Sequence, residues 1–248
     1  MLSAIRLHPA QRLEEGVGVS VRRLFPLAAV RHHDPFVLWD DFCVPAGAGF
    51  PDHPHRGFEA ITYLIQGSMQ HSDNLGNHAV VSAGGLQCFT AGRGMIHSEM
   101  PASDEAACGI QLWINLARAD KHIEPAYQQL DSRQVPEQDF EGGRKRILVG
   151  QESPLRLHTA VRFLDVRLQA GATFHESLPA AYCGLVYVLA GSLQLMYGQQ
   201  RMTLTASLSA LCEAGASPRL QAVTDSRFLL CFGRPHAETI HQHGSFVD

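Results

Sequence analysis

Four residues in two short runs of the sequence could bind a metal ion. His53 and His55 lie in the run HPHRGFE, and His97 and Glu99 lie in the run GMIHSEM. One residue separates the members of each pair, and in an extended strand this spacing directs both side chains to the same face. Two such strands side by side would bring three imidazoles and one carboxylate to a common point.

This donor set is typical of a first-row transition metal that keeps coordination positions open for a ligand. Open positions favour chemistry over a purely structural role for the metal. Fe(II) is the metal that the pattern favours, whereas Mn, Ni, Co, Zn and Cu fit the same donors as alternatives. The bound ion would keep a net positive charge, which favours an anionic, chelating substrate.

The fourth ligand has two candidates in the sequence. Glu59 lies four residues after His55, so on a regular strand it shares the face of that histidine, and Glu99 shares a face with His97. A mononuclear site with open positions needs only one of the two carboxylates. The other would form an ion pair or a hydrogen bond that orients a ligand histidine.

Other histidines are weaker candidates for a metal site, and no matching strand with a carboxylate accompanies His241 and His243. We interpret His241 and His243, which follow His236 in a polar tail, as part of a solvated or packed terminal segment. His71 and His78 flank the turn DNLGN, and we expect both at the surface.

The elements that must position these residues are short β-strands. Stretches rich in apolar, aromatic and β-branched residues recur, among them FVLWDDF, AITYLIQG, GIQLWINL and GLVYVLAG, with Gly, Asn, Asp and Pro between them. No long amphipathic helix stands out. Many short strands with frequent turns predict an all-β jelly-roll barrel or sandwich.

One strand motif occurs twice. ITYLIQGSMQ (61–70) matches LVYVLAGSLQ (185–194) at an offset of 124 residues, and the turn DNLGN is replaced by the shorter YGQQ. We therefore predict two similar domains, residues 1–125 and 145–248, joined by a polar linker at residues 126–144.

The second copy lacks the candidate ligands. The residues at the corresponding offsets are Ser177, Pro179, Leu220 or Gln221, and Ala222 or Val223. None of these sets could bind a metal ion, so we expect the second domain to be metal-free, with a structural or partner-binding role.

Composition narrows the classes of partner. The net charge is −4 and no run of Lys or Arg is longer than the three residues 144–146, so we expect no direct contact with nucleic acid. No apolar run approaches the roughly 20 residues of a membrane span, and the first residues lack the apolar core of a secretory signal. We expect a cytoplasmic protein, or a nuclear one in a eukaryote, with no membrane contact.

The six cysteines are widely spaced and form no CxxC motif. In a reducing compartment we expect them to be small buried side chains, without disulfides or zinc sites.

At the level of motifs, the chain resembles a known superfamily. The pattern H-x-H-x3-E-x7-G (His53, His55, Glu59, Gly67) is similar to the first cupin motif, and G-x2-H (Gly94, His97) is similar to the second. More narrowly, GFPDHPHRGFE, TAGRGMIHSEMP, GIQLWINL and KHIEPAYQ resemble the pirin family of bicupins, and YVLAGS and GSFVD carry a weaker resemblance in the second half.

The resemblance implies two tandem jelly-roll barrels, the first with a mononuclear non-haem iron site and the second metal-free. The family's ligands fall on His53, His55, His97 and Glu99 of this sequence. Some bacterial members are quercetin 2,3-dioxygenases, and animal members are nuclear, iron-dependent transcription co-regulators.

Two functions follow from the resemblance. In a dioxygenase, the 3-hydroxyl of a flavonol substrate would lose its proton to Glu99 or Glu59, and the ring would open between carbons 2 and 3 with release of carbon monoxide. In a non-enzymatic regulator, iron in the same site would sense redox state and alter binding to a transcription factor or a metabolic enzyme. Both need the same four ligands, and two cores in one chain are compatible with a monomer.

Overall fold

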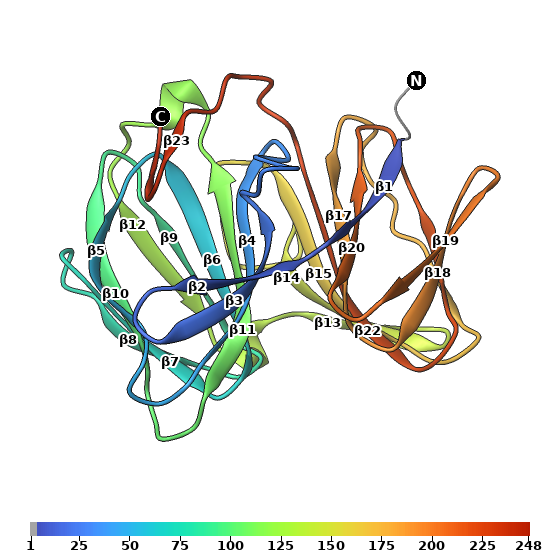
Figure 1. The fold of residues 1–248 in the computed structure, drawn as a ribbon, viewed down its shortest axis with the longest axis horizontal. Coiled ribbons are helices and arrows are strands. Elements are labelled where there is room, and N and C mark those ends of the chain that lie inside the picture. Colours follow the sequence, from blue (N-terminus) through green and yellow to red (C-terminus); the bar gives the residue numbers. More distant parts are fainter. Residues whose placement is uncertain (1–3) are drawn as a thin grey trace. The chain divides into compact units, whose positions relative to one another are not determined.

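The computed structural model describes residues 4–248, which form two compact units, each built around β-sheets (Figure 1). The first barrel comprises residues 11–135, 154–159 and 236–248. The second barrel comprises residues 4–10, 136–153 and 160–235. The predicted all-β fold with two barrels is confirmed.

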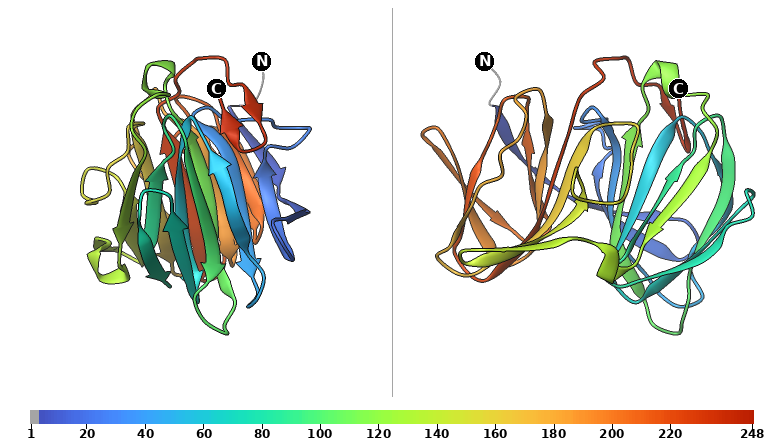
Figure 2. Two further views of the ribbon diagram at one scale, coloured as in Figure 1. Left: turned by 90° about the vertical axis from the view of Figure 1, so that its left-hand side faces the viewer. Right: turned by 180° about the vertical axis from the view of Figure 1, so that it is seen from behind.

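The first barrel contains a seven-stranded and a four-stranded antiparallel sheet (Figure 2). The seven-stranded sheet has the order β12 (Ala126–Leu130), β9 (Leu86–Thr90), β6 (Phe58–Gln66), β11 (Ala107–Asn115), β4 (Phe36–Val44), β3 (Val19–Phe25) and β2 (Gln11–Glu15). The four-stranded sheet has the order β5 (Phe50–His55), β10 (Met95–Pro101), β7 (Ser68–Asp73) and β8 (His78–Ser82). The central strand β6 is buried from Phe58 to Leu64, which explains its largely apolar sequence.

The second barrel repeats this arrangement. Its seven-stranded sheet has the order β1 (Ile5–Pro9), β20 (Leu208–Cys212), β17 (Cys183–Ala190), β22 (Ser226–Gly233), β15 (Val161–Leu168), β14 (Gly143–Val149) and β13 (Glu137–Phe140). Its four-stranded sheet has the order β16 (Thr173–Phe174), β21 (Arg219–Ala222), β18 (Ser192–Tyr197) and β19 (Gln200–Thr205). The matching motifs lie on β6 and β17, each followed by a hairpin, so the repeat in sequence is also a repeat of strand order.

The domain limits differ from the expected ones. Residues 126–144, expected to be a linker, contain β12 and β13, which are the edge strands of two different sheets. Short edge strands are half exposed and polar, so their sequence resembles that of a linker. The ends of the chain also depart from the expectation, because β1 pairs with β20 in the second barrel and residues 236–248 belong to the first.

In the described part of the chain, residues 4–248, helical structure is limited to two short turns. They are η1 (Arg118–Asp120) and η2 (Ser132–Gln134), and within residues 4–248 no helix has the length and apolar character needed to cross a membrane. Near the C-terminus, β23 (Gln242–His243) and β24 (Phe246–Val247) form a small hairpin.

The expectation that no cysteine forms a disulfide is wrong for one pair. Cys43 on β4 and Cys108 on β11 are disulfide-bonded. They lie directly opposite each other on neighbouring antiparallel strands, with their Cα atoms 4.0 Å apart. Because 65 residues separate them in sequence, only the strand register reveals the pairing. The other four cysteines form no disulfide within residues 4–248 and are buried, as expected.

Candidate metal centre

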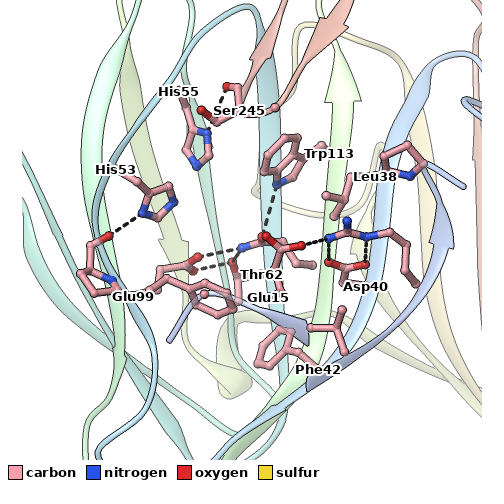
Figure 3. A pocket seen from close by; sticks show the side chains of 18 of the residues that line it. Glu15, Leu38, Asp40, Phe42, His53, His55, Thr62, Glu99, Trp113 and Ser245 are labelled. Carbon is pink, nitrogen blue, oxygen red and sulfur yellow. Dashed lines mark hydrogen bonds and ion pairs between the residues drawn. The ribbon is translucent and has the colours of Figure 1, made fainter. Parts of the chain in front are cut away.

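Strands β5 and β10 bring three histidines together. The two strands pair with His97 opposite His53 and Met95 opposite His55. The ring centroids of His53 and His97 lie 4.5 Å apart, and those of His55 and His97 lie 4.9 Å apart. One ring nitrogen of each histidine lies within 4.8 Å of the others, and no other group of His, Cys, Asp or Glu in residues 4–248 has this spacing. Figure 3 shows His53 and His55 directed into the same cavity.

Hydrogen bonds determine which nitrogen of His53 and of His55 is free. Nδ1 of His53 lies 2.7 Å from the carbonyl oxygen of Pro51, and Nδ1 of His55 lies 3.3 Å from the carbonyl oxygen of Ser245. A carbonyl oxygen can only accept, so in both histidines Nδ1 carries the proton and donates it. Each Nε2 therefore keeps a lone pair, as a metal ligand requires, and Nε2 of His53 lies 3.1 Å from Nε2 of His97.

The buried imidazoles are neutral. Burial, together with the charges that His97 and His53 would carry, lowers the pKa of His55 to about 3. Burial and the neighbouring His53 and His71 lower the pKa of His97 well below its ordinary value. Only a neutral imidazole binds a metal ion, so at neutral pH protons do not compete with a metal for these two rings.

The carboxylate of Glu99 lies in the same cavity and is held by three uncharged donors. The Thr62 hydroxyl and the Gln87 amide donate to Oε1 over 2.8 Å and 2.6 Å, and the Gln111 amide donates to Oε2 over 2.7 Å. Glu99 does not belong to the compact group of three nitrogens, so its role as the fourth ligand stays a prediction.

Glu59, the alternative fourth ligand, has other partners. Its side chain is fully buried, and it accepts hydrogen bonds from the Thr90 hydroxyl and from the backbone N–H groups of His158 and Thr159. These contacts attach the loop at residues 154–159 to the first barrel. Burial raises the pKa of Glu59, while the hydrogen bonds from Thr90 and the loop oppose that rise.

Two residues beside the histidines were missed by the sequence reasoning. His71 is fully buried rather than at the surface, and its Nδ1 lies 3.3 Å from Nδ1 of His97. Its Nε2 lies 3.0 Å from Oδ2 of Asp73, whose side chain is also shielded from solvent. His71 and Asp73 have the same i, i+2 spacing as the predicted ligand pairs, a signal that places both side chains on one face of a strand but does not reveal that this face is buried. His78, at the other end of the turn, is exposed as expected.

The C-terminal segment forms part of the site. The carbonyl oxygen of Ser245 accepts the hydrogen bond of His55, and the buried Lys121 donates to the carbonyl oxygens of Val247 and Gly57 and to Asn115. The tail is therefore packed, as one of the two interpretations predicted. The side chains of His241 and His243 are exposed and lie outside the metal cluster.

A cavity of about 640 Å³ lies beside the histidines. Leu38, Phe42 and Trp113 supply apolar walls, and Thr62 and Gln111 supply polar groups next to Glu99 (Figure 3). This volume and this mixture of walls suit a small organic ligand.

The cavity also contains a buried ion pair. The guanidinium of Arg23 contacts Asp40 over 2.6 Å and Glu15 over 2.8 Å. Burial alone would lower the pKa of Arg23, but the hydrogen bonds and charges of Asp40 and Glu15 raise it, so Arg23 stays charged.

In the second barrel, apolar side chains occupy the positions equivalent to His71 and Glu99. Glu99 pairs with His71 across β10 and β7, and Leu220 pairs with Leu195 across β21 and β18. Leu195 lies 124 residues after His71 and is therefore its counterpart in the repeat. The register then makes Leu220 the counterpart of Glu99, so the predicted match of position 99 with Ala222 or Val223 is wrong. Both leucines are buried in the apolar core of this barrel.

Comparisons with known proteins agree with this architecture. Residues 18–114 match the Pirin family model, and residues 163–248 match the model of the pirin C-terminal cupin domain. A pirin-like protein of Arabidopsis thaliana is 37% identical over 252 residues, which cover 96% of this chain and 81% of that protein. Pirin of Homo sapiens is 36% identical over 240 residues, covering 94% and 83%.

A solved structure has the same fold over nearly the whole chain. Quercetin 2,3-dioxygenase from Acinetobacter baumannii superposes with a TM-score of 0.86 at 27% identity, covering 98% of this chain and 90% of that one. Its likeness extends across both barrels. The chain therefore belongs to the pirin family, and its two barrels are the paired cupin domains of a bicupin.

Proposed function

We propose that this pirin is a metal-dependent dioxygenase that holds Fe(II) with His53, His55, His97 and Glu99 and opens a flavonol such as quercetin with O2. The observation that carries the proposal is the meeting of three imidazoles, two of which, those of His53 and His55, line a cavity of about 640 Å³. The similarity to a solved quercetin 2,3-dioxygenase supports the choice of substrate class.

The residues fit a divalent ion, because His53 and His55 each keep an unprotonated Nε2. Fe(II), when bound, would supply the Lewis acidity and the one-electron chemistry that a reaction of a flavonol with O2 needs. Mn, Ni, Co, Zn and Cu are the alternatives for the same donors.

The protein's own residues would bind the substrate and move one proton. Glu99 would accept the proton of the flavonol 3-hydroxyl at a carboxylate oxygen, while Thr62, Gln87 and Gln111 keep that carboxylate in place. Trp113 and the other apolar walls would orient the aromatic rings and exclude water from the reacting groups.

The test is a turnover assay with purified protein. The protein is loaded anaerobically with Fe(II), quercetin and air are added, and the loss of flavonol absorbance is followed together with oxygen uptake and carbon monoxide release. We expect one O2 consumed and one carbon monoxide released per flavonol. His97→Ala should abolish turnover, and His78→Ala, which alters an exposed histidine away from the cavity, should leave it unchanged.

Absence of turnover with Fe(II) and with each alternative metal would contradict the enzyme proposal. Metal content of the same samples, measured by elemental analysis, separates this outcome from a failure to bind metal. A protein that binds metal but turns over no flavonol would favour the regulator.

One observation favours the regulator as the second candidate. The hydrogen-bond partner of His55 is the backbone of Ser245, which lies in the partly exposed C-terminal hairpin. A change in the oxidation state of a metal at His55 would thereby act on a surface segment. We would expect hydrogen exchange of residues 240–248 to differ between the Fe(II) and Fe(III) forms, and identical exchange would contradict this candidate.

A further inference from the structure

Three pairs of residues with i, i+2 spacing lie on three neighbouring strands. His53 and His55 lie on β5, and His97 and Glu99 lie on β10. The third pair, His71 and Asp73, lies on β7, with Asp73 opposite His97 and His71 opposite Glu99. The first two pairs were predicted to bind the metal, but the third pair has no role in that prediction.

The third pair forms a chain of contacts that runs from the turn after β7 to the predicted ligand His97. Oδ2 of Asp73 lies 3.0 Å from Nε2 of His71, and Nδ1 of His71 lies 3.3 Å from Nδ1 of His97. Nε2 of His97 then lies 3.1 Å from Nε2 of His53, inside the group of three nitrogens. His71 and His97 are both buried, so no solvent proton donor competes along this path.

The order of donors and acceptors along this path is determined at Asp73. A carboxylate can only accept, so Nε2 of His71 carries a proton, and in the neutral imidazole its Nδ1 is left as an acceptor. Between these two nitrogens only Nδ1 of His97 can then be the donor. With its proton on Nδ1, His97 keeps the lone pair of Nε2, and this atom faces the unprotonated Nε2 of His53 over 3.1 Å, as two ligands of one metal ion would.

We propose that His71 and Asp73 are positioning residues that hold His97 in the tautomer able to bind a metal ion. Pro51 and Ser245 do the same for His53 and His55, but through backbone carbonyls that no side-chain substitution removes. The proposal rests on the metal site proposed above but not on the dioxygenase reaction.

The turn after β7 makes this proposal testable, because it fixes the orientation of the Asp73 side chain. Oδ1 of Asp73 accepts the backbone N–H groups of Leu75 and Asn77, each over 3.0 Å. In Asp73→Asn these two donors would keep the amide oxygen at that position. The amide nitrogen would then face His71 and donate to it. His71 would carry its proton on Nδ1, and His97 would be forced to carry its proton on Nε2, the nitrogen needed for the metal.

The first experiment is ¹⁵N–¹H correlation NMR of the metal-free protein with ¹⁵N-labelled histidine, which distinguishes the two imidazole tautomers. In the wild type we expect His97 protonated on Nδ1 and His71 protonated on Nε2. In Asp73→Asn we expect both assignments to be reversed. Wild-type His97 protonated on Nε2 would overturn the proposal, whether or not the protein binds any metal.

The second experiment measures the affinity for Co²⁺ by competition with a chelator. Asp73→Asn should weaken binding about 10- to 100-fold, the usual effect of losing a group that orients a metal-binding histidine. His71→Phe keeps a ring in the buried space but removes the partner that selects one tautomer of His97, so both tautomers are accessible. It should therefore weaken Co²⁺ binding less than Asp73→Asn does.

The double variant separates the tautomer effect from general damage to the hairpin. If His71 carries the effect, adding His71→Phe to Asp73→Asn should restore the affinity to that of His71→Phe alone. Equal losses from Asp73→Asn with and without His71 would overturn the proposal, as would an unchanged affinity in Asp73→Asn. If the NMR and Co²⁺ results are as expected but the protein turns over no flavonol, only the proposed function is contradicted.

Discussion

At the scale of single residues, the two glutamates that share a strand face with ligand histidines have different surroundings and therefore different expected roles. Glu99 faces the cavity and is held by Thr62, Gln87 and Gln111. Glu59 holds the backbone of the loop at residues 154–159. The sequence left both open as the fourth ligand, because each shares a strand face with a ligand histidine.

Isosteric substitution of the two glutamates tests this difference. We expect Glu99→Gln to weaken Co²⁺ binding about 10- to 100-fold, because a neutral amide is a poorer ligand than a carboxylate. Glu59→Gln should change the affinity less than about twofold, because Glu59 contacts the loop rather than the cluster. Chelator competition measures both, and the reverse order of effects would identify Glu59 as the ligand.

The stability of the first barrel should depend on the ionisation of Glu59. Burial raises the pKa of Glu59 even though hydrogen bonds from Thr90 and the loop lower it. An acid whose pKa is raised by folding contributes stability below its unfolded pKa, and this contribution is lost as the pH rises through the folded pKa. The glutamine of Glu59→Gln does not ionise. As the pH rises above the ordinary pKa of a glutamic acid, about 4.3, the difference in unfolding free energy should therefore shift in favour of the variant.

Urea unfolding followed by tryptophan fluorescence measures this trend, because both tryptophans, Trp39 and Trp113, lie in the first barrel. A difference between variant and wild type that stays constant as the pH rises above about 4.3 would contradict the expected shift.

At the scale of elements, the strands that carry the ligands could be predicted, but their neighbours could not. The i, i+2 spacing of His53 with His55 and of His97 with Glu99 depends only on local strand geometry. His71 and Asp73 share this spacing but stand next to a turn, where polar residues are usually solvated. Only the register of β7 with β10 reveals that they are buried behind His97.

The C-terminal hairpin is the second element that local patterns could not place. Its anchors are Lys121, which is buried, and the exposed ion pair of Arg56 with Asp248, over 2.8 Å. Strand propensity over such short stretches is weak, and the contacts join residues more than a hundred positions apart.

Lys121 and the Arg56–Asp248 pair should contribute differently to the free energy of unfolding. Lys121→Met would leave the buried carbonyl oxygens of Gly57 and Val247 without this donor, so we expect a loss of about 2–4 kcal/mol. Arg56→Ala breaks an exposed pair and should cost less than about 1 kcal/mol. The same fluorescence-detected urea unfolding compares them. Lys121→Met should also weaken Co²⁺ binding more than Arg56→Ala does, because it releases the segment that holds His55, and equal effects would contradict this role of the hairpin.

At the scale of the whole molecule, the repeat could be predicted from sequence because the strand motifs on β6 and β17 are alike. The matching sheet orders confirm that prediction. The placement of β1 in the second barrel and of residues 236–248 in the first was not predictable, since each pairing joins parts of the chain that are distant in sequence. The same holds for the disulfide between Cys43 and Cys108.

The repeat also bears on how many metal ions one chain can bind. Where the first barrel has His71 opposite Glu99, the second has Leu195 opposite Leu220 in its apolar core. We therefore expect elemental analysis to find one metal ion per chain in the wild type and none in His97→Ala. Leu220→Ala is the matched change in the second barrel. It should destabilise that barrel by about 2–5 kcal/mol through the cavity it leaves, with no change in metal content. A wild-type content near two, or a loss of metal in Leu220→Ala while the first barrel stays folded, would show that the second barrel takes part in metal binding.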